Sequence, residues 1–137
     1  MKNYPQFHDG DLEGFWINDS TMHVYLNTMK KECFAAVVTG VVALSARGFK
    51  AGNLILSVES YEHSEISVED ISEVHDYEKT PEDQIKAARL LEKAQLDQLV
   101  LFVISPSYGA TCLVLGHAVE VLTRKEWSER YGTLLLG

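Results

Sequence analysis

Residues 22–29 read Met-His-Val-Tyr-Leu-Asn-Thr-Met, so that apolar and polar side chains largely alternate along the segment. Alternation with a period of two is typical of a β-strand that buries one face and leaves the other polar. The pattern therefore predicts a strand with one core face and one polar face. The core face carries Met22, Val24, Leu26 and Thr28, and the other face carries His23, Tyr25 and Asn27.

The residues on either side of this segment extend it into a run of strands. Leu12–Ile17 is a second apolar run, and Asn18-Asp19-Ser20 between the two predicts the turn of a hairpin. Cys33–Leu44 is rich in β-branched residues and is interrupted by Gly40, which indicates a bulge or a close backbone approach. Asn53–Tyr61 alternates again, with Leu54, Leu56 and Val58 on one face. We expect these four strands to follow one another as a meander.

The second half of the chain combines one strong helix with three further strands. Thr80-Pro81-Glu82-Asp83 supplies a hydroxyl cap, a proline at the first helical position and acids in the first turn. This helix should run to about Asp97 and pack on the sheet through Ile85, Ala88 and Leu91. A shorter helix is expected after Ser67, which Asp70 would complete as a capping box. The strands are expected at 99–105, 110–115 and 118–122, the last two joined by a Gly116-His117 turn.

These elements predict the fold class. The chain of 137 residues, 46% hydrophobic and 23% charged, has the balance of one globular domain over residues 1–137. We expect an α+β fold dominated by antiparallel strands, about seven in number, arranged as a meander or sandwich, with one main helix packed on the sheet. No apolar signal-like segment or membrane-length apolar run occurs, which favours a cytoplasmic protein without membrane contact. Cys33 and Cys112 each lie in an apolar strand-like run and are expected as buried, reduced thiols.

Charge is strongly segregated along the chain. Residues 59–83 contain ten acids and one base, Lys79, so this segment carries all of the net negative charge of the protein. The twelve basic residues are scattered, which disfavours binding to nucleic acid and favours a basic protein as partner. The candidate partner-binding residues are Glu65, Glu69, Asp70, Glu73 and Asp76. The structural alternative is a solvated face that keeps the protein soluble.

A second candidate site consists of histidines and carboxylates. His8 and Asp9 precede the first strand, and the period of two places Glu59, Tyr61 and His63 on one face of the fourth strand. With His23, the candidate set is His8, Asp9, His23, Glu59 and His63. The structural alternatives are an Asp-Gly turn and the polar faces of half-buried strands. Their spacing matches no established metal motif, so the sequence predicts no metal site and no cofactor.

Three segments of the first half carry a family resemblance. Phe7-His8-Asp9-Gly10 leading into Leu12, Gly40-Val41 through Leu44, and Gly52-Asn53-Leu54-Ile55 resemble small acidic immunity-type proteins of bacterial toxin systems. The resemblance covers roughly the first 60 residues and marks fold rather than activity. It implies a cytosolic bacterial protein that binds and blocks a cognate toxin, with no catalytic role for His8 or Asp9.

Three functions remain open at this stage. The leading hypothesis is a non-enzymatic binding module whose acidic segment binds a basic partner, for instance a nuclease-like toxin. The first alternative is a small enzyme or metal-binding domain whose histidines, Asp and Glu converge in space. The second alternative is a structural domain that associates with itself, for example as a homodimer.

Overall fold

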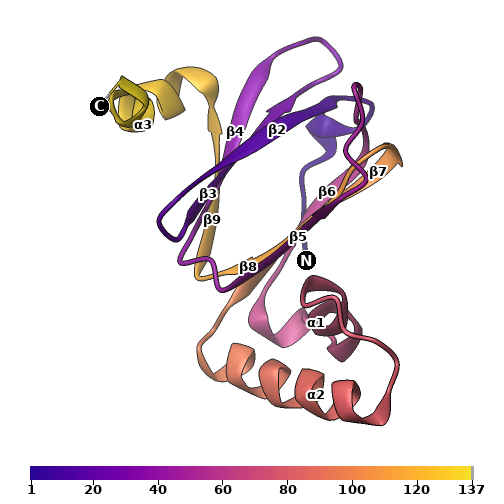
Figure 1. The fold of residues 1–137 in the computed structure, drawn as a ribbon. Helices are drawn as coiled ribbons and strands as arrows, with labels where there is room; N and C mark the ends of the chain where they lie inside the picture. The colour runs from indigo at the N-terminus through magenta and orange to yellow at the C-terminus, as the bar shows by residue number, and fades with distance from the viewer. Residues whose placement is uncertain (137) are drawn as a thin grey trace.

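The computed structural model describes residues 1–136, which form nine β-strands and three α-helices together with two short 3₁₀ helices (Figure 1). The elements in chain order are β1 (Lys2–Asn3), η1 (Pro5–Phe7), β2 (Asp11–Asn18), β3 (Thr21–Asn27), β4 (Cys33–Thr39), β5 (Ala43–Arg47), β6 (Leu54–Tyr61), η2 (His63–Glu65), α1 (Val68–Val74), α2 (Pro81–Leu96), β7 (Val100–Tyr108), β8 (Thr111–Gly116), β9 (Ala118–Thr123) and α3 (Arg124–Leu136). The predicted α+β class is confirmed. The described residues hold nine strands where about seven were expected, and they form α1 and α3 in addition to the expected main helix α2.

The strands form one antiparallel sheet that is folded into two layers. Their order is β5-β8-β7-β6-β2-β3-β4-β9, and β1 pairs with β6. Figure 1 shows β2, β3, β4 and β9 in one layer and β5 to β8 in the other. The layers are joined where Asp11 of β2 pairs with Leu54 of β6. The predicted antiparallel sheet is therefore confirmed.

The expected four-strand meander is wrong after its third strand. The run Cys33–Leu44 is two strands, β4 and β5, which lie in different layers. Gly40 ends β4 with a positive φ of 62°, and a Cβ atom there would collide with the ring of His117. The predicted close approach at Gly40 thus redirects the chain, and β5 pairs with β8 instead of β4.

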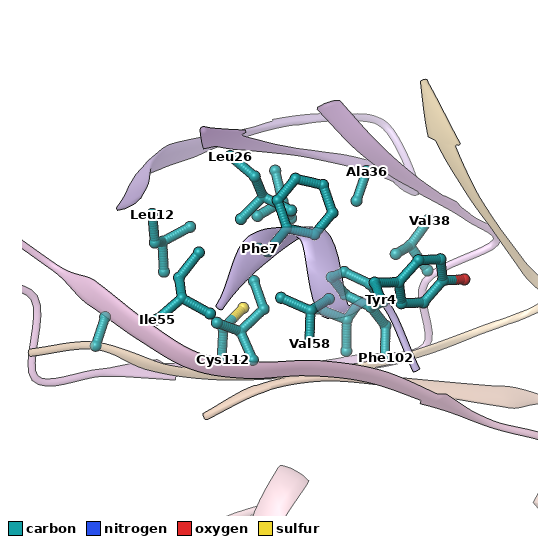
Figure 2. Close-up of a cluster of buried hydrophobic side chains, with 14 of the residues drawn as sticks. Tyr4, Phe7, Leu12, Leu26, Ala36, Val38, Ile55, Val58, Phe102 and Cys112 are labelled. Carbon is teal, nitrogen blue, oxygen red and sulfur yellow. The ribbon is translucent and has the colours of Figure 1, made fainter. Parts of the chain in front are cut away.

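The main core fills the space between the layers. Phe7 and Leu26 pack from one side against Ile55 and Phe102 from the other, and all four are at most 1% exposed (Figure 2). Within β6, two register shifts disturb the alternation, so Leu54 and Leu56 are exposed. The expected shared face of Leu54, Leu56 and Val58 is therefore wrong for the two leucines.

Helices α1 and α2 cover the outer face of β7 and β8 (Figure 1). Both predicted starts are confirmed: Ser67 and Asp70 form a reciprocal capping box, and Thr80 caps α2 ahead of Pro81. The buried stripe of α2 centres on Ala87 and Ala94, with Leu90 and Leu91 partly buried beside them. The sequence pattern also placed Ile85 and Ala88 on the packed face, but Ile85 is 55% exposed and Ala88 is exposed too.

Helix α3 covers part of the outer face of the other layer. Trp127 packs there on Ala35, Val37 and Leu122, and it is only 5% exposed. This third cluster lies on the face that the sequence pattern assigned to polar side chains. The sequence ends in an apolar run, Leu134 to Leu136, and the side chains of residues 134–137 lie outside those that the structure describes.

Candidate functional site

The acidic segment, residues 59–83, runs from the end of β6 through η2 and α1 into the start of α2. Glu69, Glu73 and Asp76 are exposed and line a shallow groove of about 600 Å3. We call these three carboxylates the α1 acidic surface. Ser72, Tyr77, Lys79 and Gln84 complete the groove together with Arg47. Exposed carboxylates around a groove of this size can form ion pairs with basic side chains of a partner protein.

Arg47 at the end of β5 neutralises part of this surface. Its guanidinium lies 3.4 Å from the Asp76 carboxylate and 3.9 Å from that of Glu73. All three side chains are about half exposed or more, so solvent screens these pairs and they contribute little to stability. Glu69 makes no ion pair within the described residues.

Two of the five predicted partner-binding residues act inside the fold. Asp70 accepts the Ser67 N–H at 2.9 Å and so caps the start of α1. Glu65 accepts the Glu62 N–H at 2.9 Å and pairs with the N-terminal ammonium of Met1, and this ammonium holds the pKa of Glu65 below its ordinary value. The structure therefore divides the predicted set: Glu69, Glu73 and Asp76 face the groove, whereas Glu65 and Asp70 stabilise local structure.

The alternative site is split among separate elements. His8 and Asp9 are exposed in the turn after η1, where His8 Nδ1 lies 2.8 Å from the Leu56 carbonyl oxygen and Asp9 has a φ of 62°. The Asp9 and His8 side chains form a mutual contact of 3.6 Å. Their positions match the turn that the Asp-Gly dipeptide indicates.

Glu59 and Tyr61 form part of the row expected on the fourth strand. The Tyr61 hydroxyl donates to Glu59 Oε2 at 3.1 Å, and Ser57 Oγ donates to Glu59 Oε1 at 3.2 Å. Burial raises the pKa of Tyr61, and the hydrogen bond to Glu59 adds to the rise. His63 leaves the row because β6 ends at Tyr61 and η2 begins at His63. The row therefore lacks its imidazole.

His23 lies under α3 rather than on an exposed sheet face. It is 1% exposed, and its Nδ1 accepts a hydrogen bond from Trp127 Nε1 at 2.9 Å. The ring stacks on Trp16 at 4.8 Å and meets Tyr131 edge-on at 4.8 Å. Burial lowers the pKa of His23, which favours the neutral imidazole that can accept this bond.

The aromatic cluster around His23 was missed by sequence reasoning. Tyr25 packs edge-on against Trp127, and the Arg124 guanidinium lies 4.6 Å from the Tyr25 ring centroid. Arg124 also pairs with Glu13 at 3.6 Å and donates to the Phe34 carbonyl oxygen at 3.3 Å. The available signal was the spacing of Trp127 and Tyr131, which places both rings on one face of a helix.

The remaining titratable side chains are dispersed over the fold. Cys112 is buried in the main core, which raises the pKa of its thiol to about 12 and keeps it protonated at neutral pH. Cys33 is exposed, so the expected burial is wrong for this residue. His75 stacks on Tyr77 at 5.3 Å, and His117 is exposed beside Gly40.

Over the described part of the chain, no group of three or more His, Cys, Asp or Glu side chains is placed to hold a metal ion. The described helices include none with the length and apolar character needed to cross a membrane. No protein-family model matches the sequence, and the searches of curated proteins and of solved structures give no significant match.

Proposed function

We propose that this protein is a non-enzymatic binding module whose α1 acidic surface binds a basic protein. The observation that carries the proposal is the groove in which Glu69, Glu73 and Asp76 gather at the surface. Aligned negative charge of this kind attracts a basic surface before contact and speeds association. The partner class includes a basic toxin, as expected for an immunity-type protein.

The charge balance of the neighbourhood supports this role. The segment 59–83 keeps its strong negative charge after Arg47 and the N-terminal ammonium offset two of its carboxylates. Repulsion among neighbouring carboxylates on a short helix destabilises it slightly, by a few tenths of a kcal/mol per close pair. A surface that the fold does not need for stability is therefore available for recognition.

A capped peptide of six arginines tests the surface directly. Titrated into isotopically labelled protein at low salt, the peptide should shift the backbone amide signals of Glu69, Glu73 and Asp76 first. The shifts should weaken as salt rises past about 0.15 M, where the screening length falls to about 8 Å. Equal shifts over the whole protein surface would contradict the proposal.

A matched pair of variants separates this surface from net charge. The triple variant Glu69→Lys, Glu73→Lys and Asp76→Lys should lose the peptide-induced shifts. The control replaces three other exposed acids, Glu32, Glu92 and Glu129, by Lys and changes the net charge by the same amount. The control should keep the shifts at α1, because the local field of the groove is intact.

A further inference from the structure

Strand β9 (Ala118–Thr123) has one free edge. It ends the described sheet order and pairs only with β4. The main-chain groups on a free edge form a template on which another extended chain can pair.

The pairing register identifies which groups face this edge. At the β3–β4 turn the Thr28 N–H donates to the Glu32 carbonyl oxygen at 2.9 Å. Hydrogen-bonding residues alternate along an antiparallel pair, so the even-numbered residues of β4 bond to β3 and the odd-numbered ones turn toward β9. Val37 therefore bonds to Glu120 of β9. Two residues to either side, Ala35 pairs with Leu122 and Thr39 pairs with Ala118. The peptide groups of Val119 and Val121 are left on the free edge.

Thr123, two residues after Val121, also fits this register. Thr123 would also direct its N–H away from β4, and this N–H donates to the side chain of Glu126 at 3.0 Å. The first turn of α3 thus satisfies one group of the free edge, and the groups of Val119 and Val121 remain beyond it.

A groove of about 440 Å3 runs beside these two residues. Val119, Glu120 and Val121 of β9 line it, together with Lys2, Asn3, Tyr4 and Gln6 of the N-terminal segment. Phe34 completes the lining. The side chains of Phe34, Val119 and Val121 are partly buried and pack on the main core, so the core reaches the surface in this groove.

From this arrangement we infer that the groove binds one extended segment of a partner protein, which pairs with the free edge of β9. The main chain of the segment would bond to Val119 and Val121, and apolar side chains at alternate positions would cover Phe34 and the two valines. The groove lies between β9 and the N-terminal segment, so its occupant must be a single extended segment that is not already part of another sheet. If a second copy of the chain paired its own β9 with this edge, its β4 would meet the N-terminal segment that lines the groove. The inference goes beyond the α1 acidic surface and is independent of it.

A capped seven-residue peptide in which valine alternates with threonine and lysine is a suitable probe. Amide hydrogen exchange measured by NMR should slow severalfold at Val119 and Val121 when the peptide is added. Exchange at Glu120 should change little, because its N–H is already bonded to β4. The same peptide with an N-methyl group at every residue has no main-chain N–H to donate on either edge and should have no effect.

Two substitutions at one position supply the control. Val121→Pro removes the free-edge N–H without removing a bond to β4, and edge strands tolerate proline in this orientation. It should weaken peptide binding about five- to tenfold, as expected for a lost main-chain hydrogen bond. Val121→Thr keeps the N–H and the branched shape and should bind within about twofold of wild type. If Val121→Pro does not fold, Val119→Pro makes the same test.

Three results would overturn the inference. They are unchanged exchange at Val119 and Val121 at millimolar peptide, equal binding by the proline and threonine variants, and a dimer that protects both amides without peptide. The triple Lys variant of the α1 acidic surface should bind this peptide as wild type does, so the two proposals can fail separately.

Discussion

Gly40 is the residue at which the chain leaves one layer of the sheet for the other. Its φ of 62° is unfavourable for residues with a Cβ, and the His117 ring occupies the space that a Cβ would need. Gly40→Ala should therefore lower the free energy of unfolding by at least about 1 kcal/mol, measured by urea denaturation. In a His117→Ala background the loss should be smaller, because only the backbone strain remains. An equal loss in both backgrounds would rule out the steric contact with His117.

His23 should make stability depend on pH. Burial lowers its pKa in the folded protein below the ordinary 6.5, so the unfolded chain takes up the proton first. The contribution of neutral His23 to the free energy of unfolding is complete above pH 6.5, and it is lost as the pH falls below that value. Burial lowers the pKa of His75 in the same direction, so His75 adds to the loss.

Urea unfolding at pH 7.5 and pH 5.0 tests the role of His23. His23→Phe should reduce the difference in stability between the two pH values and leave the part that comes from His75. At pH 7.5 the variant should be less stable by about 1–3 kcal/mol, because the buried Trp127 N–H loses its acceptor. An unchanged pH dependence would contradict the assignment of His23.

Helix α3 is attached to the rest of the fold chiefly through Trp127. This residue supplies the α3 side of the third cluster and the hydrogen bond to His23. Trp127→Ala should cost about 3–5 kcal/mol of stability and should speed amide exchange in α3 more than in β4. Lys125→Ala, at an exposed position of the same helix, is the control and should change neither quantity. Uniform loss of protection across the sheet would show that α3 does not open separately.

The elements that the sequence predicted correctly are those defined by local signals. The capping box at Ser67, the start of α2 at Pro81 and the hairpin of β2 with β3 each depend on residues close in the chain. The pairings of β5 with β8 and of β4 with β9 join segments more than 60 residues apart, and side-chain periodicity carries no information on such partners. His23 was assigned to a polar face for the same reason: the helix that covers it begins at Arg124.

The sequence predicted which residues make up the candidate site, but it did not predict the separate role of each carboxylate. The charge run identified the segment, and the Ser67 motif already predicted that Asp70 would complete a capping box. The pairing of Glu65 with the N-terminal ammonium could not be read from the sequence. Arg47 could not be assigned to the site either, since it arrives from a strand more than 20 residues earlier. The density of charge follows from the sequence, whereas the pairing of Arg47 with Glu73 and Asp76 depends on the fold.

At the scale of the whole molecule, the two grooves proposed to bind partners lie on separate parts of the surface. The groove that holds the α1 acidic surface is also lined by the end of β5 and the start of α2, and the second groove is lined by β9 and the N-terminal segment. These features share no residue. A partner could therefore bind at the α1 acidic surface through a basic region or beside β9 through an extended segment, and neither contact would depend on the other.

The central claim is that Glu69, Glu73 and Asp76 bind a basic protein. The most direct test is capture from a lysate of the native host by immobilised wild type, the triple Lys variant of these residues, and the control variant at Glu32, Glu92 and Glu129. Captured proteins are identified by mass spectrometry at about 0.05 M and about 0.5 M salt, which lie on either side of the physiological screening range. We predict that wild type and control retain the same basic protein at low salt, and that high salt and the triple Lys variant each abolish its capture. Equal capture by all three proteins at both salt concentrations would contradict the claim.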